Sequence, residues 1–317
     1  MTYKLDVKDR RILYELDKNA RISNAQIAKK VGLSPEVVYY RVKKLEENVI
    51  AKYHTLVDYN KMGLIHFKIC LKFNGISLQV EEEVYSKFAE INQVIWIAKC
   101  QGDWDCMLSC TVNSLKELDI IKDKLISLAH AHIFQKEISI LSKVFAFPRR
   151  YLLEVQHDSF NMGGDLENLD PIDLDLLRLL SKQARKPVVE IAKELELTVK
   201  VVTYRIKKLL QSGVIGHFGL VLDYSKLGIH FYKSFFYLKN PDEKRVKHLL
   251  ERLNNHPNLI YNLKVIGGWD LEPEFEFFDE QNFQKLIQEL MSEFSDIIQR
   301  INTVNVIKEY KYNLFYK

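Results

Sequence analysis

One helical segment of the sequence would place an aromatic side chain among cations. If Val38 is buried, the turn of about 100° per residue in a helix brings Val42 and Leu45 to the same side. Tyr40 and Lys43 then point outward. Cations suit phosphates, whereas aromatic and polar groups suit base edges, so this face favours an element that enters the major groove of DNA. An ordinary amphipathic surface helix has the same apolar seam, and one helix alone leaves both interpretations open.

The same face occurs a second time, where Lys200, Tyr204 and Lys207 point outward. The candidate DNA contacts lie on these two faces and at the starts of the two helices. They are Ser34, Glu36, Val37, Tyr39, Tyr40, Arg41, Lys43 and Lys44, with Thr198, Lys200, Val201, Thr203, Tyr204, Arg205, Lys207 and Lys208.

Each of these helices is the third of three short helices with recognisable starts. In the first series Asp6, Ser23 and Ser34 are N-cap residues. Gly32 suits the left-handed turn after the second helix, whereas the second series has Glu196 there, so we expect a strained or differently shaped turn. A capped three-helix series that ends in such a face, found twice, predicts two helix-turn-helix units.

The stretches 49–58 and 214–223 follow the third helices and are expected to form a wing hairpin and the strand leading away. In the first of them Lys52, Tyr53 and His54 are candidates for contact with the DNA backbone. Solvent exposure without any contact is the open alternative for each.

The chain is an internal duplication. Tyr40-Arg41-Val42-Lys43-Lys44-Leu45 reappears as Tyr204-Arg205-Ile206-Lys207-Lys208-Leu209. An insertion near Gly213 lengthens the offset between the copies by one position, and Gly102-Asp103-Trp104-Asp105 then matches Gly267-Gly268-Trp269-Asp270. The repeated unit is about 150 residues long.

Each unit continues with a strand, a helix, two strands, a helix and a strand. This order predicts a ferredoxin-like sheet with both helices on one face. The other face needs cover, which the second copy can supply as an internal pseudo-dimer. In the turns at 102–105 and 267–270, glycine could make a hairpin while Trp104 or Trp269 fills the core. Ligand binding at these turns is the alternative.

Three glutamates follow the second of these turns. Glu272, Glu274 and Glu276 share one face of a strand because side chains alternate with a period of two. We expect a solvated edge-strand face, with a site for a cation or an ammonium group as the alternative.

Four cysteines lie in the first half, at Cys70, Cys100, Cys106 and Cys110. No Cys-x-x-Cys spacing occurs, which argues against a zinc ribbon. Cys100 and Cys106 would face each other if the hairpin turned about residue 103. A redox pair is then conceivable, but small buried hydrophobic side chains are the expected role.

Composition and charge place the chain among ordinary globular proteins. It has 317 residues, with 47% hydrophobic and 28% charged residues and a net charge of +4. No run of about 18 apolar residues could cross a membrane, and the charged start argues against a secretory signal, so we expect a cytoplasmic protein. Lys and Arg outnumber Asp and Glu by 12 to 7 in residues 4–52 and by 9 to 6 in residues 169–217. Positive charge is thus concentrated in the two blocks expected to meet DNA.

The run from Leu33 to Glu46, together with the turn from Gly102 to Asp105, resembles the Lrp/AsnC family of feast/famine transcription regulators, and most of all its tandem archaeal members. The resemblance covers nearly the whole chain twice. It implies a winged helix-turn-helix joined to a ligand-sensing RAM-type module, assembled as dimers and often as higher oligomers.

The resemblance also implies an effector, usually an amino acid, bound where sensor modules meet near this turn. The implied effector residues are Gly102, Asp103, Asp105, Gly267, Gly268 and Asp270. In the second copy Gly268 replaces Asp103, and the glutamates replace the usual apolar strand, which argues against the same pocket there.

The expected fold is α+β, in two repeats. We expect a winged helix-turn-helix at 1–60, a ferredoxin-like module at 61–150, a polar and flexible linker at 151–168, a second winged helix-turn-helix at 169–225 and a second module at 226–317.

The leading hypothesis is a sequence-specific DNA-binding transcription regulator that binds double-stranded DNA and responds to a small effector. It includes no catalytic residue, cofactor or metal, and it pairs its two copies internally and forms homo-oligomers. One alternative is a siroheme-decarboxylase-like enzyme on the same scaffold, for which the scattered histidines give little support. The other is a sensor or partner protein that does not bind DNA.

Overall fold

The structure is a computed structural model that describes residues 2–155 and 159–315. The chain opens with three helices, α1 (Val7–Lys18), α2 (Asn24–Val31) and α3 (Pro35–Asn48). Their N-caps are the expected Asp6, Ser23 and Ser34, and each side chain accepts a hydrogen bond from a backbone N–H in the first turn. Local sequence therefore sets these helix starts.

The second copy repeats this arrangement with α6 (Pro171–Lys182), α7 (Val188–Glu194) and α8 (Val199–Gln211). The N-cap residue of α7 is Pro187, which makes no side-chain cap hydrogen bond. Glu196 has φ of 54°, close to the 67° of Gly32 in the first copy. The expected strain after the second helix is therefore present, because a residue with a Cβ atom disfavours this left-handed conformation.

The wing hairpins expected at 49–58 and 214–223 are wrong. Each copy has one continuous strand here, β1 (Ile50–Val57) and β7 (Ile215–Leu222), and the two pair with each other antiparallel. Residues 49–58 contain no Gly and no Asn-Gly or Asp-Gly pair to turn the chain back. The backbone hydrogen bonds are instead satisfied by the other copy.

Both copies then have the expected order of elements, beginning after a short helical turn, η1 (Asn60–Met62) or α9 (Tyr224–Leu227). In the first copy these are β2 (Ile65–Phe73), α4 (Leu78–Ala89), β3 (Val94–Gly102), β4 (Cys106–Val112), α5 (Leu115–Ala129) and β5 (Ile133–Ala146). In the second they are β8 (His230–Leu238), α10 (Glu243–Asn254), β9 (Leu259–Gly267), β10 (Leu271–Phe277), α11 (Glu280–Glu293) and β11 (Ile298–Tyr312).

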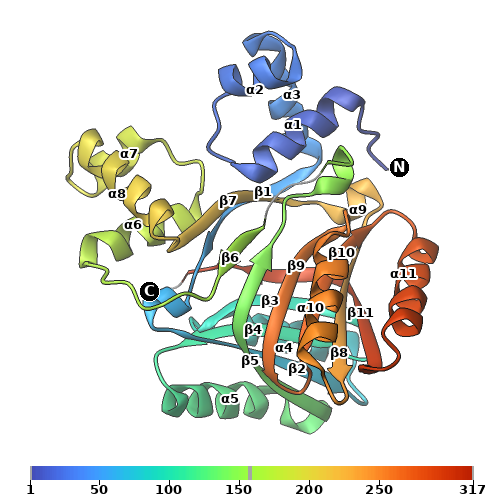
Figure 1. Ribbon diagram of the computed structural model, residues 1–317. Coiled ribbons are helices and arrows are strands. Elements are labelled where there is room, and N and C mark those ends of the chain that lie inside the picture. The colour runs from blue at the N-terminus through green and yellow to red at the C-terminus, as the bar shows by residue number, and fades with distance from the viewer. Residues whose placement is uncertain (1, 156–158, 316–317) are drawn as a thin grey trace.

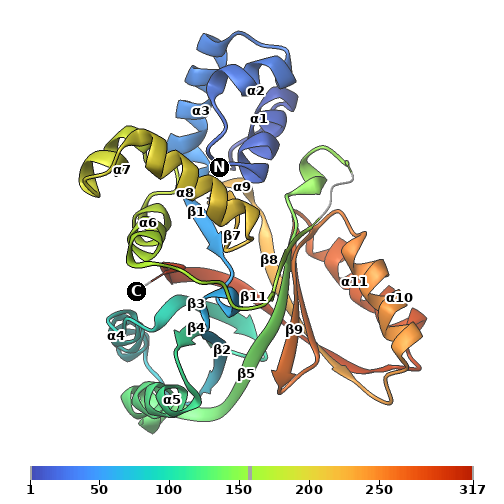
Figure 2. The same cartoon turned by 60° about the vertical axis from the view of Figure 1, so that its left-hand side comes forward.

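The strands of the two copies join into one closed barrel. Strand β5 pairs first with β2 of its own copy and then with β9 of the other, and β11 likewise pairs with β8 and then with β3. The strand order β5-β2-β4-β3-β11-β8-β10-β9 returns to β5, so neither sheet has a free edge. The helices of the modules lie outside the barrel, and both helix-turn-helix units lie on one side of it (Figures 1 and 2).

Part of the segment expected to be a flexible linker has regular structure. A helical turn, η3 (Arg150–Leu152), begins it, and β6 (Phe160–Met162) adds to the end of β5. The N–H groups of Gly163 and Gly164 donate to the carboxylate of Asp58. Residues 156–158 of the linker lie outside the described residues. In the described chain no helix is long and apolar enough to span a membrane.

The four cysteines are free and buried. Cys106 is paired with Lys99, one position away from the expected register, so Cys100 and Cys106 point to opposite faces of the sheet. Cys100 faces the barrel interior, and Cys106 faces the helices. Burial raises the pKa of Cys100 to about 12 and that of Cys106 well above its usual value. This geometry excludes a redox pair and leaves four small core side chains.

Candidate nucleic-acid interface

The third helix of each copy packs through the expected seam. Val38, Val42 and Leu45 of α3 are buried, as are the corresponding residues of α8. On the outward faces Tyr40 is 70% and Tyr204 is 66% exposed. A tyrosine this exposed contributes little to the core, so both rings are available to a partner.

Other candidate contacts on these faces are exposed as well. Besides the two tyrosines they are Ser34, Glu36, Val37, Tyr39, Lys43, Lys44, Thr198, Lys200, Val201, Thr203, Lys207 and Lys208. Two of them also have a local role, because Ser34 and Thr198 cap their helices. Lys44 lies 5.7 Å from the ring centre of Tyr3, at the edge of the surface.

Arg41 and Arg205, two of the expected DNA contacts, form ion pairs within their own helix-turn-helix units. The guanidinium of Arg41 lies 2.8 Å from Asp6 and 2.6 Å from Asp9, the two residues of the capping box of α1. Arg205 makes the same pair of contacts with Asp170 and Asp173. Both arginines are only partly exposed, so they hold the third helix on the first and are occupied within the protein.

Among the candidate contacts, the two third helices differ in charge at one position, Glu36 in the first copy and Lys200 in the second. Glu36 lies in the first turn of α3, where its own backbone N–H and the hydroxyl of Ser34 lower the pKa of its carboxyl group. Lys200 takes the corresponding place in α8. A carboxylate accepts hydrogen bonds and an ammonium donates them, so the two faces have opposite hydrogen-bonding chemistry at this position.

Lys52, Tyr53 and His54, the candidates for contact with the DNA backbone, have contacts within the protein. Lys52 donates to the carbonyl of Tyr312 at 2.5 Å, and the hydroxyl of Tyr53 donates to Glu46 at 2.8 Å. His54 is buried beside His217, with ring centres 5.5 Å apart. These side chains point inward because β1 is a strand between the helices and the barrel.

The glycine turns lie at the seams between the copies. Gly102 has φ of 131°, and a Cβ atom there would come within 2.5 Å of the carbonyl of Thr303 in the other copy. Gly267 has φ of 132°, and a Cβ atom there would come within 2.8 Å of the carbonyl of Ile138. Only glycine fits both the backbone conformation and the approach of the other chain segment. Trp104 and Trp269 are buried, as expected if glycine makes the turn and the tryptophan fills the core.

The other implied effector residues have contacts within the protein. The carboxylate of Asp105 accepts from Lys72 and from the N–H of Phe73, both at 2.8 Å. Asp103 accepts from the N–H of Thr303, and Asp270 accepts from that of Leu238. At Gly268, which has no aspartate side chain, the side chain of Glu137 occupies the space that a Cβ atom would take.

A surface hollow of about 380 Å³ lies beside the first turn. Asp105, Glu81 and Lys99 line it together with Phe73 and Ile76. Lys99 and Glu81 form an ion pair of 2.6 Å there. The hollow therefore offers both signs of charge next to apolar side chains, which is suitable for a small zwitterion.

The three glutamates of β10 are buried, and the expectation of a solvated edge strand is wrong. Strand β10 lies between β8 and β9, and its glutamates point into the barrel interior. Glu272 and Glu274 pair with Lys68 and Lys233, and Glu276 pairs with Arg149. The ammonium groups of Lys233 and Lys68 lower the pKa of Glu274 against the effect of burial, whereas burial raises the pKa of Glu272.

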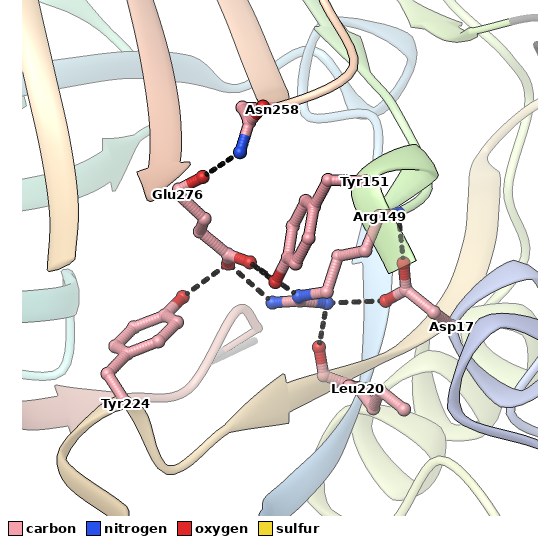
Figure 3. Close-up of polar contacts among 7 residues, drawn as sticks. All are labelled: Asp17, Arg149, Tyr151, Leu220, Tyr224, Asn258 and Glu276. Atoms are coloured by element: carbon pink, nitrogen blue, oxygen red, sulfur yellow. Dashed lines mark hydrogen bonds and ion pairs between the residues drawn. The ribbon is translucent and has the colours of Figure 1, made fainter. Parts of the chain in front are cut away.

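Arg149 connects parts of the chain that are far apart in sequence (Figure 3). Its guanidinium bonds to Asp17 of α1 at 2.5 Å, to the carbonyl of Leu220 in β7 at 3.0 Å and to Glu276 of β10 at 2.8 and 2.9 Å. The hydroxyl of Tyr151 also donates to Glu276. The first helix-turn-helix is thus tied to the second α/β module. Sequence reasoning missed this residue, and no local pattern marks it.

A cavity of about 130 Å³ lies at the mouth of the barrel beneath β1 and β7. Its walls are mostly apolar and aromatic, and His66, Lys68 and Arg149 are among its polar residues. The ring of His66 lies 2.6 Å from the hydroxyl of Ser109, and burial lowers the pKa of His66 to about 3, which keeps the ring neutral. In the described residues no group of His, Cys, Asp and Glu side chains could hold a metal ion.

Comparison with known proteins gives two family models, both over the helical units. A model of the AsnC-type helix-turn-helix domain matches residues 5–46, and a model of winged helix-turn-helix DNA-binding domains matches residues 169–215. The class defined by this pair of units on a shared barrel is that of helix-turn-helix regulators.

Relatives with single units support the same class. An HTH-type transcriptional regulator of Pyrococcus horikoshii is 35% identical over 124 residues, 38% of this chain and 83% of the relative. The proline dehydrogenase transcriptional activator of Rhodobacter capsulatus is 33% identical over 133 residues, 41% of this chain and 86% of the relative. The chain belongs to the Lrp/AsnC family of transcription regulators, and its duplicated units have the fold of that family.

A solved structure has the fold of the whole duplicated chain. The siroheme decarboxylase NirDL has a TM-score of 0.64 and 14% identity, with 98% of this chain and 94% of that one covered. At this identity the likeness concerns the fold alone.

Proposed function

We propose that this regulator binds double-stranded DNA sequence-specifically through both α3 and α8. The observation that carries the proposal is the pair of exposed helix faces, each with a tyrosine among lysines. The two helical units that carry these faces lie on one side of the barrel (Figure 2). Each helix is held by an arginine clamp to its first helix, so the outward side chains sit on rigid supports.

Salt dependence of binding tests this function. Lysines that neutralise phosphates release counterions, so affinity for genomic fragments should fall steeply as salt rises. The double substitution Lys43→Ala with Lys207→Ala should reduce this salt dependence and weaken binding to all sequences. Arg245→Ala with Asp296→Ala, which removes an exposed ion pair of the second module, is the matched control. Binding that is insensitive to salt, or no binding to any fragment, would remove the proposal.

We further propose that a small effector acts near the glycine turns, at Gly102, Asp103 and Asp105 of the first copy. The hollow beside Asp105, with Glu81 and Lys99, supports an amino acid as the class of effector. The corresponding Gly267, Gly268 and Asp270 lack the aspartate at the second position, so the first copy is the favoured site. Calorimetry with single amino acids should show binding that Lys99→Met abolishes. Unchanged binding would place the effector elsewhere.

In this proposal the chain is a regulator and has no enzymatic activity of its own. It works in the cytoplasm, where the DNA is accessible, and whole chains associate further into homo-oligomers. The siroheme-decarboxylase-like alternative predicts a tetrapyrrole bound to the purified protein, with a strong absorption band in visible light. The alternative of a sensor without DNA binding predicts failure of the salt titration with correct folding.

A further inference from the structure

Four buried charges meet inside the barrel. Lys68 of β2 and Lys233 of β8 are equivalent positions of the two copies, in the same alignment that matches Gly102 with Gly267. Lys68 Nζ lies 2.5 Å from Glu272 Oε1 and 3.3 Å from Glu274 Oε1. Lys233 forms an ion pair with Glu274, and its Nζ lies 3.9 Å from Glu272 Oε1. All four side chains are at most 5% exposed, so water does not compensate their charges.

The carboxylates of this cluster come from one copy only. Met107 and Ser109 take the places in β4 that Glu272 and Glu274 take in β10. The nearby Arg149 of the first copy pairs with Glu276 of the second copy and also with Asp17 of its own copy. Within the cluster of Lys68, Lys233, Glu272 and Glu274, the first copy thus contributes one cation, and the second contributes one cation and both carboxylates.

The backbone pairing between the copies, in contrast, is equivalent over most of its length, although β11 has a second irregularity, between Glu309 and Lys311, that β5 lacks. Val304 of β11 faces Gly102 of β3, and Ser139 of β5 faces Gly267 of β9. These two pairs are equivalent in the alignment of the copies, because Ser139 corresponds to Val304. Strand register alone would therefore also permit a barrel made of two first copies from different chains, or of two second copies.

We propose that the buried charges restrict each sheet to pairing with the unlike copy. A barrel of two first copies would bury two Lys68 ammonium groups opposite methionine and serine. A barrel of two second copies would bury the carboxylates of Glu272 and Glu274 twice over, with too few lysines to neutralise them. An uncompensated buried charge is strongly unfavourable, so both like pairs are disfavoured. The partner that fits the sheet of the first copy is therefore a sheet of the second copy. This inference does not depend on the DNA-binding function.

The test uses the whole chain with one added cleavage site. A protease site is inserted between Asp165 and Leu166, which are exposed and outside regular structure. Cleaved protein in light and heavy isotopic forms is mixed, unfolded in denaturant, refolded and examined by native mass spectrometry. We expect every pair to contain one N-terminal half and one C-terminal half, with light and heavy halves mixed at random among these pairs. Like pairs in the wild-type protein would overturn the proposal.

Two variants decide whether charge is the cause. The charge-free variant Lys68→Met, Lys233→Met, Glu272→Met, Glu274→Met should increase the share of like pairs about tenfold or more, since the repulsion is gone. Met107→Glu gives the first copy a carboxylate that can face Lys68 of a second first copy, so it should produce like pairs of that copy. Arg245→Ala with Asp296→Ala is the control and should pair as the wild type does.

The charge-free variant and the Met107→Glu variant test the proposal independently, so the test still works if one of them does not refold. If the charge-free protein does not fold, the Met107→Glu protein alone decides. Exclusive unlike pairing in the variants that fold would show that shape, and not charge, selects the partner.

Discussion

The cations of α3 and α8 have two roles. Some form ion pairs that hold the helix in place, and others are exposed on its outward face. Arg41 forms ion pairs with Asp6 and Asp9, whereas Lys43 is exposed on the outward face. Arg41→Ala should therefore lower the free energy of unfolding by about 1 kcal/mol, the upper range for a partly exposed ion pair. Lys43→Ala should leave it unchanged and weaken DNA binding. Urea denaturation and fluorescence anisotropy measure the two effects, and equal loss of affinity with unchanged stability in both would contradict this assignment.

Buried histidines make the stability of the protein depend on pH. Burial lowers the pKa of His66 and His217 to about 3 in the folded state, below the ordinary value of 6.5. As pH falls below about 6.5, the unfolded chain takes up protons that the folded chain does not. Stability should then fall by about 1.4 kcal/mol per pH unit for each such histidine. Denaturant titrations over about two pH units below neutral measure the slope.

The variant His217→Gln assigns part of this slope to one residue. It should reduce the slope of unfolding free energy against pH by the contribution of one histidine, about 1.4 kcal/mol per pH unit, whatever it does to stability at neutral pH. A slope equal to that of the wild type would show that His217 does not titrate in this way.

At the scale of elements, the turn after the second helix offers a paired comparison. Glu196 adopts the positive φ that Gly32 adopts in the first copy. Glu196→Gly should raise the free energy of unfolding by about 1 kcal/mol, and Gly32→Ala should lower it by about as much. Urea denaturation of both variants tests the expectation. A loss of stability in Glu196→Gly would mean that its side chain makes a contact worth more than the strain.

Strand β10 offers a rescue experiment. Glu272→Met with Glu274→Met leaves Lys68 and Lys233 buried without carboxylates, which should cost about 3–5 kcal/mol. Adding Lys68→Met and Lys233→Met removes the stranded charges and should restore most of the stability. Thermal and urea unfolding give the measurement. A quadruple variant no more stable than the double would show that packing, and not charge, explains the loss.

Elements that depend on local signals were predictable from the sequence. The helix starts at Ser23 and Ser34 and the seam of Val38 follow from caps and periodicity, which act within a few residues. The wing hairpin was predicted wrongly because the partner of β1 lies in the other copy. The period of two placed Glu272 and Glu274 on one face, but it could not tell that the barrel covers that face.

In the candidate site, too, only the features that follow from local sequence patterns were predictable. Tyr40 and Lys200 are exposed as the helical periodicity indicated. Arg41 and Arg205 were assigned to DNA because outward-leaning cations at this spacing also suit phosphates, and only the fold brings Asp9 and Asp173 beside them. Arg149 could not be found, since its partners are defined by tertiary structure alone.

At the scale of the whole molecule, the two helix-turn-helix units and the barrel are connected by direct contacts. Arg149 binds the first unit through Asp17 and the barrel through Glu276, and β1 with β7 joins the two units to each other (Figures 1 and 3). The cavity beneath β1 and β7 lies at this junction. A change in the barrel therefore has a direct physical route to the spacing of the recognition helices.

The most direct test of sequence-specific DNA reading is selection of bound DNA from a random pool by the intact protein. Because Glu36 and Lys200 present opposite chemistry, we predict an enriched site made of two unlike half-sites. Glu36→Lys should make the half-sites more alike, which ties the sequence read to the helix. A pool that shows no enrichment after selection, with a folded protein, would contradict sequence-specific reading by these helices.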